Sequence, residues 1–180
     1  MLSKSVLRIA LLGSALLIAS SSYAQQPAPT PAPNPLDTVP DKMPFDVPYG
    51  TPIALDRAQA LIATAVGEAK KHDWKMNVAV VDSGGNLVAF QRMDGAQLAS
   101  IQISEHKARA AAIYRRETKV YENGIQLSNL LYTMTLDGMI ASRGGIPLVE
   151  GGKLIGAIGC SGGSGSQDEV VCKAGAATIK

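Results

Sequence analysis

A short stretch near the C-terminus has the residue types and spacing of a serine nucleophile. The sequence GCSGG at 159–163 fits the pattern G-x-S-x-G, which surrounds the catalytic serine of α/β-hydrolases. Such an enzyme also places a histidine after the serine in chain order, whereas both histidines, His72 and His106, precede Ser161. The sequence therefore favours a strand end that turns into a helix over a serine hydrolase. Backbone N–H groups of such a turn can still bind an anion.

Iron ligation is a second chemistry that the sequence offers. His106 lies in a predicted helix beside Lys107, and neutral imidazole is a common protein ligand of iron. The alternative is a histidine at the surface or in an interface. His72 stands at a predicted helix end, where capping is the expected role. No C-x-x-C-H motif occurs, so covalent attachment of a c-type heme is excluded. Other side chains that can ligate iron, or instead pack in the core, are Tyr121, Tyr132, Met134 and Met139.

Three cations suit a carboxylate, such as the acid group of a bound ligand or of a substrate. They are Arg92, Lys107 and Arg109, whose N–H groups form charge-assisted hydrogen bonds with carboxylates. For Arg92, an ion pair with Asp82 or Asp94 is the alternative.

Acidic residues offer acid–base chemistry but also have ordinary structural roles. Asp82 and Asp94 lie near strand ends and can act as a pair, although capping a turn is what aspartate usually does there. Asp168 and Glu169 fall in the first turn of a predicted helix, where the helix dipole favours acids. No catalytic constellation can be identified from these residues, so the sequence leaves open whether the protein is an enzyme.

The two cysteines, Cys160 and Cys172, are placed to meet. Cys160 ends a predicted strand, and Cys172 lies on a helix that should fold back over that strand. An oxidising compartment favours a disulfide between them. Two buried free thiols are the alternative, and a redox-sensing pair is a third reading.

Helices and antiparallel strands must position all these residues. A helix is predicted to start at Thr51-Pro52 and to end at Lys70-Lys71, with apolar residues on one face. Two β-hairpins are predicted at 76–93 and 146–159 from β-branched runs around glycine-rich turns. The other predicted elements are a helix at 98–115, a helical or irregular stretch at 118–139, and a helix from 166 or 167 to 178. This order predicts an α+β fold, an antiparallel sheet with helices packed on it.

The N-terminal part of the chain has a different character. Residues 1–24 combine two basic residues, an apolar run and small residues at the end, which predicts a secretory signal peptide rather than a membrane anchor. The mature protein is therefore expected to be periplasmic or secreted. Residues 25–50 hold eight of the ten prolines and predict a Pro-rich disordered linker, with a recognition segment as the alternative. Residues 51–180 are predicted to form one domain.

Charge excludes a nucleic-acid partner. The chain has 17 Lys and Arg against 15 Asp and Glu, and removal of Lys4 and Arg8 with the signal peptide leaves 15 of each sign. The remaining charges are mixed along the chain, so no basic face for nucleic acid or anionic lipid is expected.

Four segments of the chain occur in the order VAVVDSGGNLVAFQRMDGA, SEHKARAA, RGGIPLVEGGKLIGAIGCSGG and QDE. Together they resemble the GlcG/HbpS-type heme-binding family. The resemblance implies a profilin-like α/β sandwich with about five antiparallel strands, noncovalent heme binding and assembly into a homo-oligomer. It also implies kinship with a domain at the C-terminus of some corrinoid adenosyltransferases, and with proteins from operons that degrade small organic or aromatic acids.

The resemblance extends to individual positions but not to an axial ligand. Positions that match its motifs are Asp82, Arg92, Met93, Asp94, Ser100, Lys107, Gly144, Gly145, Ser161, Gly162 and Asp168. The candidate binding residues are His106, Lys107, Arg92, Ser100, Gly144, Gly145 and Ser161, with His106 as the candidate iron ligand.

Three hypotheses follow. The first is an exported homo-oligomer that binds heme or another small ligand. The second is an enzyme or accessory protein for a small organic or aromatic acid, which holds the acid with Arg92 or Lys107 and moves protons with Asp82, Asp94 or His106. The third is a scaffold that contacts a partner through the Pro-rich arm.

Overall fold

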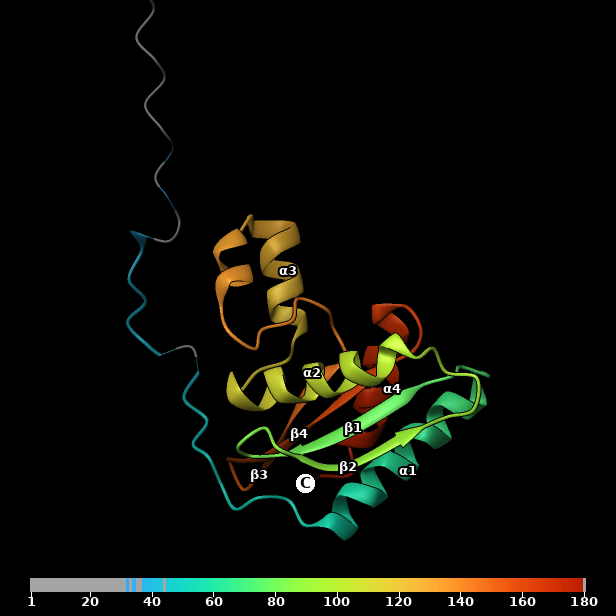
Figure 1. Cartoon of the computed structure of the whole chain (residues 1–180). Helices are drawn as coiled ribbons and strands as arrows, with labels where there is room; N and C mark the ends of the chain where they lie inside the picture. Colours follow the sequence, from blue (N-terminus) through green and yellow to red (C-terminus); the bar gives the residue numbers. More distant parts are fainter. Residues whose placement is uncertain (1–31, 33, 35–36, 44, 180) are drawn as a thin grey trace, which may run out of the picture. The chain divides into compact units, whose positions relative to one another are not determined.

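The computed structural model describes residues 32, 34, 37–43 and 45–179 (Figure 1). The predicted signal peptide at 1–24 and part of the predicted linker at 25–50 lie outside these residues. The chain divides into two units, Met1–Asp41 and Lys42–Lys180, and the second contains every helix and strand discussed below. Within the described part of the chain, no helix has the length and apolar character needed to cross a membrane.

One antiparallel sheet forms the centre of the second unit. Its strands are β1 (Asn77–Asp82), β2 (Leu87–Arg92), β3 (Gly145–Glu150) and β4 (Lys153–Ser161), in the order β2-β1-β4-β3. The predicted hairpins are β1–β2 and β3–β4, and both are confirmed. They meet where β1 pairs with β4, so these two strands are central and β2 and β3 are edges.

The expected sheet of about five strands is not confirmed, because the described residues form a sheet of four. The segment before the first helix lies beside β4 but contributes only a single-residue parallel bridge, Tyr49 with Leu154. Pro48 and Pro52 flank this bridge and have no N–H group to donate, so a continuous ladder cannot form there.

Helices cover both faces of the sheet (Figure 1). Helix α2 (Ala99–Ile113) packs on one face against β1, β3 and β4, while α1 (Leu55–Lys71) and α4 (Gly165–Ala176) pack on the other and against each other. Helix α3 (Lys119–Ser128) and the short 3-10 helix η2 (Leu131–Thr135) follow α2 and pack mainly against one another. The α+β prediction is thus confirmed.

The predicted start of the first helix at Thr51-Pro52 is wrong. Helix α1 begins at Leu55, after an extended Ala54. The preceding backbone is bonded to β4 instead, since the N–H of Gly50 donates to the carbonyl of Leu154 at 2.7 Å and that of Ile53 to Ile155 at 2.8 Å. These contacts are distant in sequence, and a local capping pattern cannot reveal them.

Strand β1 shows why both faces are buried. Alternate side chains of a strand point to opposite faces. Val78 and Val80 join the larger core under α1 and α4, and Ala79 and Val81 join the smaller core under α2. All four are at most 2% exposed.

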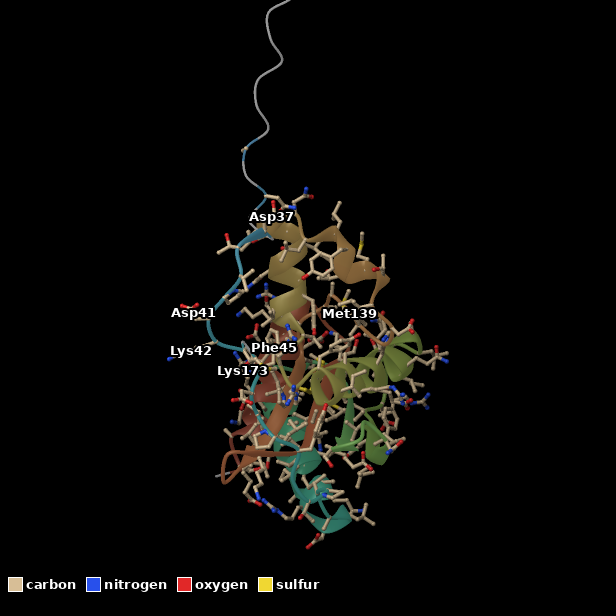
Figure 2. All side chains as sticks on the ribbon, turned by 90° about the vertical axis from the view of Figure 1, so that its left-hand side faces the viewer. Asp37, Asp41, Lys42, Phe45, Met139 and Lys173 are labelled. Carbon is tan, nitrogen blue, oxygen red and sulfur yellow. A yellow bond between two sulfur atoms is a disulfide. The ribbon has the colours of Figure 1, made fainter. Side chains whose placement is uncertain are left out.

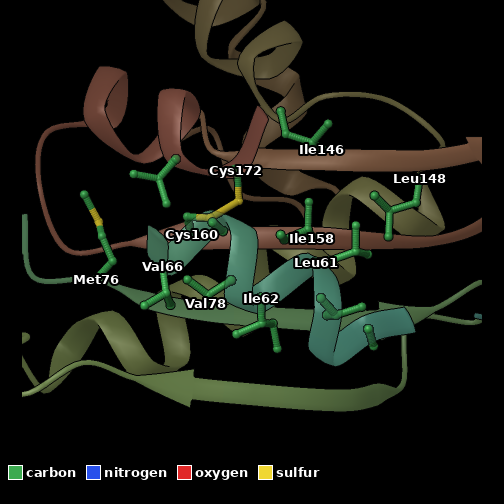
Figure 3. Close-up of a cluster of buried hydrophobic side chains, with 14 of the residues drawn as sticks. Leu61, Ile62, Val66, Met76, Val78, Ile146, Leu148, Ile158, Cys160 and Cys172 are labelled. Atoms are coloured by element: carbon green, nitrogen blue, oxygen red, sulfur yellow. A yellow bond between two sulfur atoms is a disulfide. The ribbon is translucent and has the colours of Figure 1, made fainter. Parts of the chain in front are cut away.

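The larger core also contains the disulfide that the sequence left open (Figure 3). Cys160 at the end of β4 is bonded to Cys172 in α4, with the Cα atoms 5.6 Å apart. The last helix is therefore covalently attached to the central strand on which it packs.

Glycines allow α2 to lie very close to the sheet. Gly145 and Gly159 face each other across the β3–β4 ladder. A methyl group on Gly159 would lie 2.1 Å from the carbonyl oxygen of Ser104, and one on Gly145 would lie 2.3 Å from that of Lys107. Only hydrogen atoms fit between these strands and the helix backbone.

Candidate functional site

Five of the predicted binding residues converge at one end of the sheet, where α2 crosses the ends of β3 and β4. They are Ser100, Lys107, Gly144, Gly145 and Ser161. The hydroxyl of Ser161 donates to that of Ser100 at 2.9 Å, and both side chains are buried. The structure brings these residues together as a packed, hydrogen-bonded cluster.

The ammonium group of Lys107 is paired inside this cluster. Its Nζ donates to Oδ2 of Asp168 at 2.7 Å, and the two side chains are 1% and 3% exposed. Oδ1 of Asp168 accepts the N–H of Gly163 at 3.1 Å. Burial raises the pKa of Asp168, while Lys107 and the backbone N–H bonds oppose this rise. Asp168 is thus the internal partner of Lys107 rather than a simple helix cap.

Gly144 makes room for this ion pair. Its φ of 110° lies in a region that suits glycine, and a methyl group there would lie 2.9 Å from Cβ of Asp168 and 3.3 Å from Nζ of Lys107. The carbonyl of Gly144 accepts the N–H of Cys160 at 2.9 Å, which fixes the strand end beneath the pair.

The G-x-S-x-G stretch has the structural role that the sequence favours. Ser161 is the last residue of β4, an antiparallel strand, and α4 begins at Gly165 after a capping box formed by Ser164 and Gln167. Among the described contacts, the partner of the Ser161 hydroxyl is Ser100 and not a histidine.

His106 lies elsewhere, on the exposed side of α2. It lines an open groove of about 440 Å³ between α2 and the turn of the β1–β2 hairpin. Arg109 is three residues further along α2 and lines the same groove, while Val81 and Leu87 provide apolar surface. We call this surface the His106 groove; its other lining residues are Gly85, Asn86, Gln102 and Glu105.

Arg92 lies in a third place, at the end of the edge strand β2. It is exposed and shares a shallow hollow with Lys70, Lys75 and Asp94. Neither Asp82 nor Asp94 forms an ion pair with Arg92 among the described side chains. Oδ1 of Asp82 accepts the N–H groups of Gly84 and Asn86, so Asp82 caps the hairpin turn.

The residues of the enzyme hypothesis are therefore spread over separate places. Lys107 is paired with Asp168, Arg92 and Asp94 share the hollow at β2, and His106 lies in its own groove. His72 is the C-cap residue of α1, as predicted, and its ring stacks on Trp74.

A pocket that sequence reasoning did not assemble lies at the end of α2 beside α3 and η2. We call it the aromatic pocket; its volume is about 210 Å³. It is lined by Phe45, Tyr114, Arg116, Val120, Tyr121, Gly124, Leu130, Tyr132, Thr133 and Leu136. Figure 2 shows Phe45 on the extended segment that precedes α1. The sequence offers Tyr121 and Tyr132 as residues that contact heme, but it does not single out Arg116. Three of the five tyrosines fall between 114 and 132, and this clustering is the sequence signal for the pocket.

Ion pairs attach α3 to α4 and to the loop before β3. Glu169 of α4 accepts hydrogen bonds from Lys119 at 3.0 Å and Lys173 at 2.6 Å, and Glu122 of α3 accepts from Nε of Arg143 at 2.8 Å. Burial alone would raise the pKa of both glutamates. The bonds from these cations outweigh burial and hold each pKa below its usual value.

Acidification should loosen α3 before it unfolds the core. Because the folded-state pKa values of Glu122 and Glu169 lie below the usual 4.5, their stabilising effect is complete above about pH 4.5 and is lost as the pH falls through the folded values. In an NMR titration, the amide signals of 119–128 should shift at higher pH than those of β1. Glu122→Gln should make the α3 signals less pH-dependent. Identical titration of α3 and β1 in the unmodified protein would contradict this expectation.

A family model described as "Haem degrading protein HbpS-like" matches residues 53–177, which is nearly the whole compact unit. Protein GlcG of Escherichia coli K12 is 43% identical over 104 residues, which cover 58% of this chain and 77% of GlcG.

Two solved structures have a similar fold. The crystal structure of HbpS has a TM-score of 0.68 at 29% identity, and the match covers 75% of this chain and 95% of HbpS. A structure described as a PduOC:heme complex has a TM-score of 0.65 at 26% identity, and the match covers 72% of this chain and 96% of the other.

Proposed function

Since the chain belongs to the HbpS-like family of haem degrading proteins, we propose that it binds heme noncovalently and that His106 is a ligand of the iron. The observation that carries this proposal is the heme complex of a protein with the same fold. A profilin-like sandwich, which the sequence resemblance implies, is part of the same proposal.

The His106 groove supplies the chemistry that heme requires. An exposed imidazole can approach the iron without rearrangement of the core, because the backbone of α2 is fixed against the sheet. Arg109 lies on the same side of the helix and is suited to a propionate. Leu87, which is 53% exposed, offers apolar contact to the macrocycle, whereas Val81 is almost completely buried.

A homo-oligomer belongs to this proposal because the groove is open and many apolar side chains are exposed. Leu87 beside the groove is 53% exposed, and Leu127 and Met134 of the α3–η2 region are 78% and 61% exposed. A second copy that covered such side chains would remove apolar surface from water.

Export to the periplasm or beyond is also proposed. It is supported by the predicted signal peptide at 1–24 and by the Cys160–Cys172 disulfide, a bond typical of oxidising compartments. The part of the Pro-rich segment that precedes Phe45 would then act as a linker in front of the heme-binding domain, since Phe45, Tyr49 and Gly50 already contact that domain.

Hemin titration tests the assignment of His106. The unmodified protein should shift the Soret band at stoichiometric heme, and His106→Ala should weaken heme binding at least about tenfold, since even outer-shell partners of a metal ligand contribute about 10- to 100-fold. His72→Ala is the matched control, because this histidine caps α1 and stacks on Trp74. An unchanged spectrum and affinity in His106→Ala would reject His106 as the ligand.

Native mass spectrometry of protein isolated from its own host tests the remaining parts together. We expect a mature chain that begins near residue 25, a mass consistent with one disulfide, and several copies with bound heme. A single copy with an intact N-terminus and no additional mass would contradict the proposal.

A further inference from the structure

We propose that the aromatic pocket binds a small aromatic carboxylate, at a site separate from the His106 groove. The two places share no lining residue. This inference does not depend on heme binding.

The hydroxyl of Tyr121 is a hydrogen-bond donor without a partner. Tyr121 is 3% exposed, and its Oη is one of two buried side-chain nitrogen or oxygen atoms in the described residues that form no hydrogen bond. Burial is the main cause that raises its pKa to about 12, so the phenol keeps its proton at neutral pH. Buried polar groups are nearly always satisfied in folded proteins. Tyr121 is one of the residues that line the pocket, and the proposed ligand would supply the acceptor atom that this donor lacks.

Arg116 gives the pocket a positive charge. Its Nε donates to the carbonyl of Tyr114 at 3.2 Å, and its guanidinium stacks on the rings of Phe45 and Tyr121. Among the described residues, no carboxylate forms an ion pair with Arg116. Its terminal N–H groups are therefore available to an anion, and a carboxylate matches the geometry of a guanidinium.

The walls and the volume select a ligand with one aromatic ring. Phe45, Tyr114, Tyr121 and Tyr132 line the pocket, and the rings of Tyr114 and Tyr121 meet edge to face with centroids 5.5 Å apart. Aromatic walls favour an aromatic guest through offset and edge contacts. A cavity of about 150 Å³ is known to hold benzene. The 210 Å³ here leave room for one ring with its carboxylate but not for a whole porphyrin.

Calorimetric titration with benzoate tests the proposal. Benzoate should bind, and neutral benzamide, which has the same shape, should bind at least about tenfold more weakly. Tyr121→Phe removes only the hydroxyl and should weaken benzoate binding about 10- to 100-fold, the range for a hydrogen bond to a charged group. Arg116→Gln should have an effect of similar size. The matched control is Arg115→Gln, since Arg115 stacks on Tyr49 outside the pocket.

A second measurement separates lost binding from lost folding. Because the Tyr121 hydroxyl is unsatisfied without ligand, Tyr121→Phe should have a Tm equal to or above that of the unmodified protein. Heme binding should be unchanged in this variant, so failure at either site can be recognised separately. The proposal is overturned if benzoate does not bind, if benzamide binds equally well, or if Tyr121→Phe binds benzoate with unchanged affinity.

Discussion

Replacing Lys107 with methionine should lower the free energy of unfolding by about 3–5 kcal/mol, the usual cost of removing one partner from a buried ion pair. Lys107 and Asp168 are almost completely buried, and their charged atoms lie 2.7 Å apart. Methionine fills similar space but leaves the carboxylate of Asp168 without its cation. Urea unfolding at pH 7 measures the loss.

The pH dependence of this variant provides a second readout. Without the cation, the folded-state pKa of Asp168 rises further above its unfolded-state pKa. The destabilisation should therefore grow as the pH rises from the unfolded-state pKa to the folded-state pKa, and it should shrink in acid. Lys107→Met combined with Asp168→Asn should recover much of the loss, since the amide oxygen can still accept the N–H of Gly163. Lys71→Met, at an exposed ion pair, should change stability by less than about 0.5 kcal/mol. A loss below about 1 kcal/mol in Lys107→Met would contradict the assigned role.

The structural role of Lys107 also affects how the activity of a Lys107 variant should be interpreted. The enzyme hypothesis expects Lys107→Ala to abolish turnover. Because Lys107 holds Asp168 in the folded core, such a loss would first have to be distinguished from unfolding. His106 lines the His106 groove and Tyr121 lines the aromatic pocket, so substitutions at these two residues are better tests of ligand binding.

Gly159→Ala should be among the most damaging additions of a single methyl group, with a loss of about 3 kcal/mol or more. The new Cβ would lie 2.1 Å from the carbonyl oxygen of Ser104 and 2.5 Å from the backbone nitrogen of Ala108. Both contacts are with helix backbone, which has no rotamer to change, so α2 as a whole must move away from the sheet. Thermal unfolding should show a large decrease in Tm.

Gly67→Ala provides the matched control and should have the opposite sign. Gly67 lies in the interior of α1, is exposed, and has no atom within 4 Å of an added Cβ. Alanine there should stabilise the protein by about 0.5–1 kcal/mol, because glycine loses more backbone entropy in a helix. Equal effects of the two substitutions would show that α2 does not rest on Gly159 as described.

Local patterns in the sequence predicted most of the fold. β-branched runs around glycine-rich turns identified both hairpins, and periodic apolar residues identified α1; the helices predicted at 98–115 and from 166 or 167 to 178 correspond to α2 and α4. The start of the first helix and the number of strands were not predicted correctly, because both depend on contacts between segments that are distant in sequence. The backbone of Gly50 and Ile53 bonds to β4, which delays α1, and Tyr49 forms a bridge instead of a full fifth strand.

The candidate site was harder to predict for the same reason. Lys107 and Asp168 are 61 residues apart, and each has a plausible local role, one as a ligand-binding cation and the other as a helix cap. Burial decides between these roles, and a single sequence does not report burial of a charged residue. Ser100, Gly144 and Ser161 follow from the family resemblance; in the structure Gly144 lies against this pair, and Ser161 is hydrogen-bonded to Ser100.

The disulfide closes a covalent ring that runs from Cys160 to Cys172 and contains the exposed residues Gly163 and Ser164. Short exposed segments of small residues are where proteases cut folded chains. A nick at this point would not release α4, because the sulfur bridge still joins the C-terminal fragment to β4 and Asp168 still lies against Lys107. The nicked protein would migrate as one band on a denaturing gel until reductant separated the fragments.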